Sequence, residues 1–330
     1  MKKWPKLVTG DVIDVIAPGY AVTPATVEKS IQALQELGYT PRVPKDLLAG
    51  NDDTPYFHSN TDPIRFRHLQ KALFAKDSKA IWCLRGGYGS NRLIPMLAKL
   101  KAPAHNKVFI GISDVTSLHV FLNQKWQWVT LHASLLDRLA KNRLPAPVRA
   151  ETLAVLRGEN QQTSFSLQPL NAAARKKKTL HGEIVGGNLT VLQSTLGTPW
   201  SVKGKGRFLF LEDTGERGYR IDRMLEHFRQ ANVLAACRGI LFGQFIGGDE
   251  PDLSDAVDSE GSRRIGIRTV PPSRVTEAIE RFALENPKIP VWSGIESGHG
   301  ETLRPVAFGS QAQVVHKGNS IELHVETGSR

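Results

Sequence analysis

The segment from Lys107 to Leu122, KVFIGISDVTSLHVFL, constrains the fold of this chain more than any other. Its apolar run 108–112 has the length of a buried strand, and apolar side chains then recur every three or four residues, as in a helix. A strand that turns into a helix through Gly-x-Ser is the layout of a nucleophile elbow, which exposes a serine at the carboxyl end of a sheet. Val115 replaces the second glycine of that motif, so Ser113 is interpreted either as a nucleophile or as a helix cap.

Strand and helix patterns alternate through the first 135 residues or so. The apolar runs and the amphipathic segment between them are residues 12–17, 26–37, 80–84 and 108–112. This alternation predicts an α/β fold with a mostly parallel sheet flanked by helices. Ligands bind at the carboxyl ends of such strands, and both Ser113 and the glycine-rich segment 85–90 follow strands.

The second half of the chain has a larger share of short strand patterns. We expect three parts: an α/β domain at 1–145, a linker at 146–180, and a β-rich C-terminal domain at 181–330. The polar, charged segment 247–272 is typical of an exposed excursion. The segment 126–131 is expected to be a strand.

Composition excludes several classes of protein. The chain has 330 residues, 40% hydrophobic and 23% charged, as ordinary globular proteins do. It has no apolar run long enough to span a membrane and no signal-peptide pattern, so we expect no membrane association and a cytoplasmic location. Cys83 and Cys237 are too far apart in sequence to indicate a zinc motif or a disulfide framework. No cluster has metal-ligand spacing, so we expect neither metal nor cofactor.

The net charge of +11 favours a nucleic acid or an acidic substrate as partner. The densest basic run, 175–178, lies in a polar stretch without aromatic residues that could stack bases, so we interpret it as a solvated loop and expect no nucleic acid. A non-enzymatic basic protein that binds nucleic acid or an anionic glycan remains an alternative. The segment 86–89, GGYG, lacks the Gly-Lys-Ser/Thr ending of a phosphate loop, which argues against nucleotide binding.

Three positions combine a reactive side chain with a strand end or a glycine-rich backbone. They are Ser113, the acidic pair Glu212-Asp213, and His299 between two glycines. Together they could supply the nucleophile, the acid and the base of a serine hydrolase. The backbone N–H groups of segment 86–89 could then face Ser113 as an oxyanion hole.

Each of these assignments has an alternative. Glu212 could pair with a surface arginine, and His299 could be an ordinary loop histidine. His132, which follows a strand, is the strongest rival base. His119 lies on the apolar face of the helix after Ser113, where packing is the expected role.

Five motifs follow one another along the chain: RGGYG at 85–89, GISDVT at 111–116, GGNL at 186–189, LED at 211–213 with YRIDRM at 219–224, and GHG at 298–300. Together they resemble the LD-carboxypeptidases, serine peptidases that trim peptidoglycan peptides, and their microcin-C-resistance relatives. The resemblance covers nearly the whole chain. It implies Ser113 as nucleophile, Glu212 as acid and His299 as base, with the backbone N–H groups of Gly87 and Asp114 as oxyanion donors. It also implies a triad completed across a cleft between two domains, commonly in a homodimer.

The sequence therefore predicts a metal-independent serine carboxypeptidase that cleaves the bond between an L-centre and a terminal D-alanine in muropeptide stems, with a role in peptidoglycan recycling. A departure from the family is Ala133-Ser134 after His132, where the family often has Gly-Pro. The alternative within the family is hydrolysis of microcin-C-like peptidyl or aminoacyl nucleotides, for which Trp200 and Trp292 could stack a base.

Overall fold

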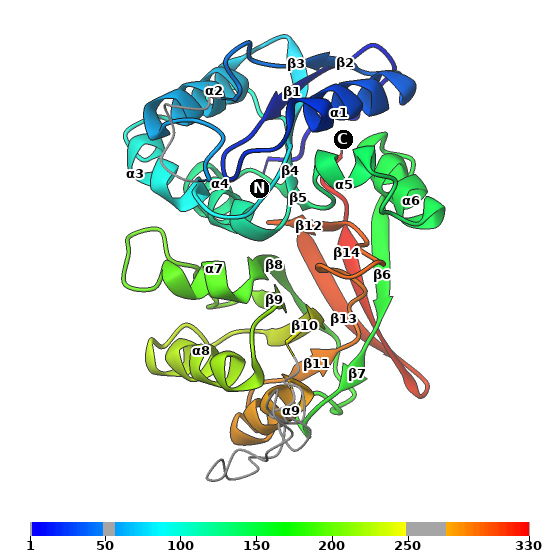
Figure 1. The fold of residues 1–330 in the computed structure, drawn as a ribbon. Coiled ribbons are helices and arrows are strands. Elements are labelled where there is room, and N and C mark those ends of the chain that lie inside the picture. Colours follow the sequence, from blue (N-terminus) through cyan, green and yellow to red (C-terminus); the bar gives the residue numbers. More distant parts are fainter. Residues whose placement is uncertain (1, 49–56, 249–274, 330) are drawn as a thin grey trace, which may run out of the picture.

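The computed structural model describes residues 2–48, 57–248 and 275–329 and contains two sheets (Figure 1). The first has six strands in the order β12-β5-β4-β3-β1-β2. Five of them are parallel and β12 pairs antiparallel with β5. Their bounds are β1 Val12–Ile16, β2 Thr40–Arg42, β3 Ser78–Cys83, β4 Val108–Gly111, β5 Thr130–His132 and β12 Val306–Phe308. The predicted parallel α/β sheet is confirmed.

Helices cover both faces of this sheet (Figure 1). One face packs on α2 and α4 through a buried cluster that includes Phe109 and Leu118, and the other packs on α1 and α5 through Val108 and Leu34. Side chains that alternate along β4 therefore enter two different cores, as the pleat of a strand requires. The helices are α1 Pro24–Glu36, α2 Asp62–Phe74, α3 Ile94–Leu97, α4 Thr116–Trp126, α5 Leu136–Ala140 and α6 Ala146–Leu156.

The strand order fixes where a ligand can bind. β1 lies between β2 and β3, so the connections that leave these strands diverge to opposite sides at that point. In open parallel sheets, the crevice beyond the carboxyl ends of the strands at such a reversal is the usual ligand site. The loops that start at Ala17 and Leu84 flank this crevice, and Ser113 follows the neighbouring β4.

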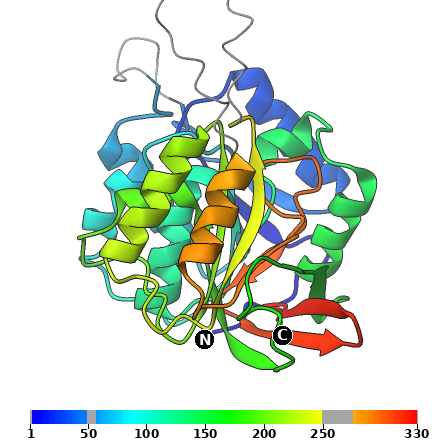
Figure 2. The same ribbon diagram turned by 90° about the horizontal axis from the view of Figure 1, so that it is seen from below.

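The second sheet has eight strands in the order β6-β14-β13-β8-β9-β10-β11-β7, of which β8 to β11 are parallel. Helices α8 and α9 lie side by side over its parallel part (Figure 2). The bounds are β6 Gln162–Ser166, β7 Gln168–Pro169, β8 Leu180–Asn188, α7 Leu189–Ser194, β9 Phe208–Thr214, α8 Gly218–Gln230, β10 Gly239–Ile246, α9 Val275–Glu285, β11 Val291–Ser293, β13 Gln311–Lys317 and β14 Ser320–Glu326. The β-rich C-terminal part is thus confirmed, and its described residues include the three helices α7, α8 and α9.

The structure differs from the sequence expectations in two places. The segment 146–180 was expected as a linker that holds one helix at 148–156. It contains that helix, α6, and also two strands, β6 and β7, that belong to the second sheet. The strand expected at 126–131 begins only at Thr130, because α4 continues to Trp126 and ends where Gln127 adopts a left-handed conformation. Trp126 is held in the helix by ring contacts with Trp128 and Phe74.

The segment 247–272 and the search for membrane-spanning helices complete the description of the fold. The excursion expected at 247–272 lies outside the described residues except for its first two. A search of the described helices finds none whose length and apolar character would let it cross a membrane.

Candidate active site

Ser113 sits at a strained turn between β4 and α4. Its φ of 71° is left-handed, a conformation that costs a non-glycine residue free energy and that clusters at functional sites. It opens a short 3₁₀ turn, Ser113–Val115, that leads into α4. The residues before and after it are buried whereas Ser113 is half-buried, so the turn brings its side chain toward the surface. This is the geometry of a nucleophile elbow despite Val115. It disfavours the interpretation as a plain helix cap, since within the described parts of the chain neither the turn nor α4 begins with a side-chain cap bond.

The glycine-rich loop after β3 lies against Ser113. A Cβ on Gly86 would be 2.9 Å from Cβ of Ser113 and 3.2 Å from its Oγ, so only glycine allows this approach. The N–H of Gly87 donates no hydrogen bond to any described residue. The N–H of Asp114 lies in the first helical turn, where N–H groups have no partner within the helix. Both groups implied as oxyanion donors are thus beside the serine.

The side chain of Asp114 has a role that sequence reasoning missed. Its carboxylate is buried and accepts hydrogen bonds from the N–H of Gly89 at 3.1 Å and of Ser90 at 2.8 Å. Burial raises the pKa of Asp114, against the lowering effect of these bonds. Asp114 therefore ties the glycine-rich loop to the elbow.

Glu212 and His299 form an ion pair far from each other in sequence. Nδ1 of His299 lies 2.6 Å from Oε2 of Glu212, whose side chain is 0% exposed, while that of His299 is 18% exposed. Burial alone would lower the pKa of His299, but the carboxylates of Glu212 and Asp213 outweigh it, so the net pKa is raised above 6.5. Because Nδ1 faces the carboxylate, Nε2 is left to act on another group. Glu212 therefore pairs with the histidine and not with a surface arginine.

A hydrogen bond joins the start of α4, just after Ser113, to the strand that pairs with Glu212. The N–H of Asn188, at the end of β8, donates to Oγ1 of Thr116 at 3.0 Å, one helical turn after Ser113. Asn188 is the register partner of Glu212 in the β8–β9 pair. A Cβ on Gly187 would lie 2.5 Å from the same Oγ1, which explains the glycine there. The second sheet thus presents Glu212 next to the start of α4.

Asp213, the second acid of the predicted pair, is engaged elsewhere. Its carboxylate accepts bonds from Nδ2 of Asn188, from the N–H and hydroxyl of Thr190, and from the N–H of Thr214. Burial and the neighbouring charge of Glu212 raise the pKa of Asp213 to about 6. It holds the first turn of α7 and leaves Glu212 as the acid that contacts histidine.

Two side chains hold the His299 loop, and neither was found from sequence. Oε1 of Gln244 accepts from the N–H of Gly300 at 3.1 Å, and its Nε2 donates to Oγ1 of Thr302 at 2.6 Å. Nη2 of Arg138, on α5, donates to the carbonyl of Gly300 at 2.8 Å. The loop is therefore fixed from both sheets. A long polar side chain at a strand end was the only signal that could have identified Gln244.

The rival histidines are both fully buried. The ring of His132 lies between those of Phe210 and Phe308, and neither of its nitrogens has a partner among the described residues. Burial lowers the pKa of His132 well below 6.5. His119 contacts the carbonyl of Gly111 through Nε2 at 2.9 Å, and burial lowers its pKa to about 4. His119 thus packs as expected, and His132 is enclosed in the core, where a substrate cannot reach it.

The remaining candidates lie outside this site. The basic run 175–178 is exposed in a turn, as expected for a solvated loop. Trp292 is buried and offers no open face to a base, and Trp200 is half-buried against the core of the first sheet. Within the described residues, no group of three or more His, Cys, Asp or Glu could hold a metal ion.

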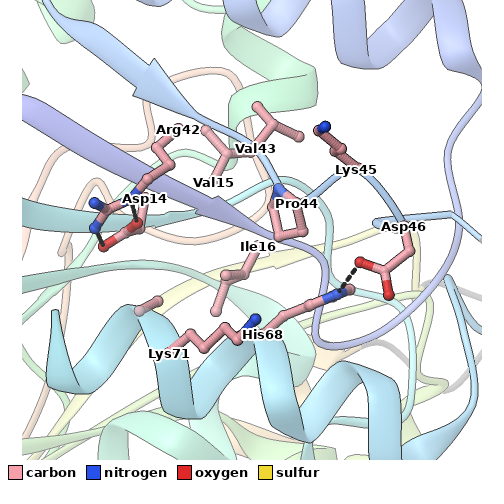
Figure 3. A pocket seen from close by; sticks show the side chains of 11 residues that line it. Asp14, Val15, Ile16, Arg42, Val43, Pro44, Lys45, Asp46, His68 and Lys71 are labelled. Atoms are coloured by element: carbon pink, nitrogen blue, oxygen red, sulfur yellow. Dashed lines mark hydrogen bonds and ion pairs between the residues drawn. The ribbon is translucent and has the colours of Figure 1, made fainter.

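A separate cavity of about 350 Å³ lies between β1, the segment after β2 and α2 (Figure 3). An ion pair between Asp14 and Arg42 and a hydrogen bond between Asp46 and His68 line it. Ser113, Glu212 and His299 are not among its lining residues, so this cavity is distinct from the candidate site.

Two family models match the chain. The model of the LD-carboxypeptidase N-terminal domain matches residues 13–133, and that of the LD-carboxypeptidase C-terminal domain matches residues 181–314. The chain belongs to the LD-carboxypeptidase family. Membership assigns it to the peptidases and confirms the resemblance drawn from the five motifs.

Similar proteins with assigned names are also called carboxypeptidases. A Bacillus subtilis protein named a probable murein peptide carboxypeptidase is 33% identical over 246 residues, which is 72% of this chain and 72% of that protein. A Rickettsia prowazekii protein named as a carboxypeptidase is 43% identical over 190 residues. That match covers 57% of this chain and 60% of the relative, so the chain spans about three fifths of the Rickettsia protein.

Solved structures share the fold of this family member. The muramoyltetrapeptide carboxypeptidase of Oxalobacter formigenes superposes with a TM-score of 0.76 at 24% identity, over 97% of this chain and 100% of that one. MccF in complex with glutamyl sulfamoyl guanosine superposes with a TM-score of 0.76 at 19% identity, over 100% of each chain. Both superpositions include the two sheets of this chain.

Proposed function

We propose that this LD-carboxypeptidase family member is a serine-type peptidase that removes the terminal D-alanine from peptidoglycan stem peptides by cleaving its bond to an L-centre. The observation that carries the proposal is the 2.6 Å contact between His299 and the fully buried Glu212. A buried carboxylate on Nδ1 fixes the tautomer of a histidine and stabilises its cationic form, which is what a general base in acyl transfer needs. The names of the murein and muramoyltetrapeptide carboxypeptidases among its relatives give the substrate class.

In this mechanism Ser113 is the nucleophile. Nε2 of His299 takes the hydroxyl proton as Oγ of Ser113 attacks the carbonyl carbon, and Glu212 balances the charge of the imidazolium. His299 then gives that proton to the amine of the leaving D-alanine, and an acyl ester on Ser113 remains. A water molecule, deprotonated by His299, hydrolyses the ester and restores the serine.

The oxyanion is stabilised by the N–H groups of Gly87 and Asp114. Charge develops on the carbonyl oxygen only in the transition state, so donors held in place beforehand lower the barrier without a cost of reorientation. The bonds from Gly89 and Ser90 to the Asp114 carboxylate hold these two donors relative to each other. Loss of one such donor typically lowers kcat on the order of 10²-fold or more.

The test is to incubate the purified protein with a muramoyl tetrapeptide and to follow release of D-alanine by mass spectrometry. Wild type is expected to convert tetrapeptide to tripeptide, and Ser113→Ala to lose this activity while keeping the unfolding midpoint of wild type. Release of D-alanine at the wild-type rate by Ser113→Ala would refute the assignment of the nucleophile, and no release by wild type would refute the substrate.

No observation favours the microcin-C-like substrate over the stem peptide, since Trp292 is buried and Trp200 is half-buried. Family membership argues against a non-enzymatic basic binding protein. The expected homodimer stays a prediction, which analytical ultracentrifugation would check.

A further inference from the structure

A hollow of about 480 Å³ lies beside the His299 loop. Its lining residues are Arg138, Asn142, Arg143, Leu144, Pro145 and Glu301. Five of them belong to α5 and the segment that follows it, at the carboxyl edge of the first sheet, and Glu301 comes two residues after His299. The hollow is therefore formed where the two halves of the candidate site meet.

Arg138 joins this hollow to the proposed base. It is half-buried, and Nη2 donates to the carbonyl of Gly300, the residue next to His299. A guanidinium has five N–H donors, and Gly300 is the acceptor recorded for Arg138 in the described chain. The other donors remain available to a ligand in the hollow.

Arg143 supplies a second guanidinium. Its N–H donates to the carbonyl of Arg138 at 3.0 Å, which holds both residues on one turn. Its side chain is exposed and is paired with no carboxylate in the described parts of the chain. Glu301 adds one negative charge at the rim, so the lining carries two cations and one anion, with an apolar wall at Leu144 and Pro145. Two arginines beside an apolar wall suit a carboxylate attached to a small apolar group.

We propose that this hollow binds the free C-terminal carboxylate of the leaving D-alanine, and so makes the enzyme an exopeptidase. The inference rests on the proposed function. His299 protonates the nitrogen of the leaving residue, and that nitrogen shares one α-carbon with the carboxylate, so the two groups are only about 3 Å apart. Since Arg138 contacts Gly300, one residue beyond His299, a carboxylate there is within reach of a guanidinium while its nitrogen faces the histidine. The methyl group of alanine lies against Leu144 and Pro145.

The test compares two tetrapeptides that differ only in the last residue, D-alanine or D-alaninamide. Wild type is expected to cleave the acid with kcat/KM at least about tenfold above the amide, the size of effect typical of a charged hydrogen bond. Arg143→Gln is expected to raise KM for the acid about tenfold, to leave the amide unchanged, and so to abolish the preference. Arg143→Lys should restore part of it, and the exposed Arg149→Gln, outside this hollow, should keep the wild-type ratio.

A binding measurement separates this proposal from the proposed function. On Ser113→Ala protein, calorimetry should give tighter binding of the acid than of the amide, and the difference should vanish when Arg143→Gln is added. Equal affinity for acid and amide, or an unchanged preference in Arg143→Gln, would overturn the proposal even if wild type releases D-alanine. A third tetrapeptide carries the amide on its diamino acid and keeps the free carboxylate of D-alanine. If this amidation, and not that of D-alanine, weakens binding, the hollow binds the carboxylate of the diamino acid, and the assignment to D-alanine is wrong. If wild type releases no D-alanine, the proposed function fails. The calorimetric comparison still shows whether the hollow binds the carboxylate of D-alanine.

Discussion

Nδ1 of His299 and Oε2 of Glu212 lie 2.6 Å apart although 87 residues separate them in the chain. Glu212 lies in the buried part of β9, and His299 lies on the loop that joins the second sheet back to the first. The pair is held by Gln244 and Arg138 on the histidine side and by the β8–β9 register on the acid side.

Glu212→Gln should remove most of the activity without unfolding the protein. The amide keeps the shape of the side chain but cannot stabilise a cationic His299, so kcat should fall on the order of 10²- to 10⁴-fold. Steady-state kinetics on the tetrapeptide measure this, with circular dichroism as the control for folding. A kcat within a factor of two of wild type would show that His299 needs no carboxylate.

The activity should depend on pH through His299. Its raised pKa places the acid limb of kcat/KM above pH 6.5, because the neutral imidazole is the base. The same raised pKa means that the ion pair stabilises the fold fully below pH 6.5, and that this contribution is lost as the pH rises through the folded pKa. In Glu212→Gln the limb should move to lower pH, since burial then dominates. A limb that stays in place would mean that another group titrates.

Gly86→Ala should impair catalysis more than stability. Gly86 has no left-handed backbone, so the added Cβ meets only its neighbours, chiefly Cβ of Ser113 at 2.9 Å. A displaced nucleophile should lower kcat on the order of 10²-fold. Gly182→Ala is the matched control, because its Cβ would be crowded at 3.0 Å by Arg238 and Gly206, away from the site. Equal effects of the two variants on kcat would contradict the close approach to Ser113.

Gln244→Leu should loosen the His299 loop. The variant removes the acceptor of the Gly300 N–H and the donor to Thr302 but keeps most of the side-chain volume. We expect kcat to fall roughly tenfold or more, with a smaller change in KM, because the base is misplaced while the binding groups remain. Gln193→Leu, an exposed glutamine that contacts His227, should leave both constants unchanged. A pure KM effect in Gln244→Leu would indicate contact with substrate instead.

Thr116→Val should weaken the junction between the two sheets. Valine has the same shape but leaves the buried N–H of Asn188 without its acceptor, which should cost about 1–3 kcal/mol of unfolding free energy. Thr152→Val is the control, since that hydroxyl donates to a helical carbonyl and its loss leaves no N–H unpaired. Urea unfolding of both variants measures the difference, and equal losses would argue against a special role for Thr116.

Much of the fold follows from local patterns. The alternation of apolar runs and amphipathic segments predicts the parallel sheet, because each strand buries both faces and each helix buries one. The strand expected at 126–131 was wrong at its start, since the ring contacts of Trp126 extend α4 and no local pattern reports them. Strands β6 and β7 were missed because they pair with segments more than a hundred residues away.

In the candidate site too, some residues were predicted from the sequence and others were seen only in the structure. The motifs located Ser113, Glu212 and His299, and the structure brings the last two into contact. The roles of Arg138, Gln244 and Thr116 could not be identified from sequence, because each side chain bonds to a backbone group in another element. Such bonds depend on tertiary geometry and leave no spacing in the sequence.

The strand β12 has a consequence for how this protein can be divided. The C-terminal family model includes Val306–Phe308, yet these residues complete the edge of the N-terminal sheet, next to β5. A fragment that ends at residue 133 would expose the backbone of β5 as an open edge, which invites association with other chains. The two family domains are therefore not separate modules that recombination or a linker cut could exchange.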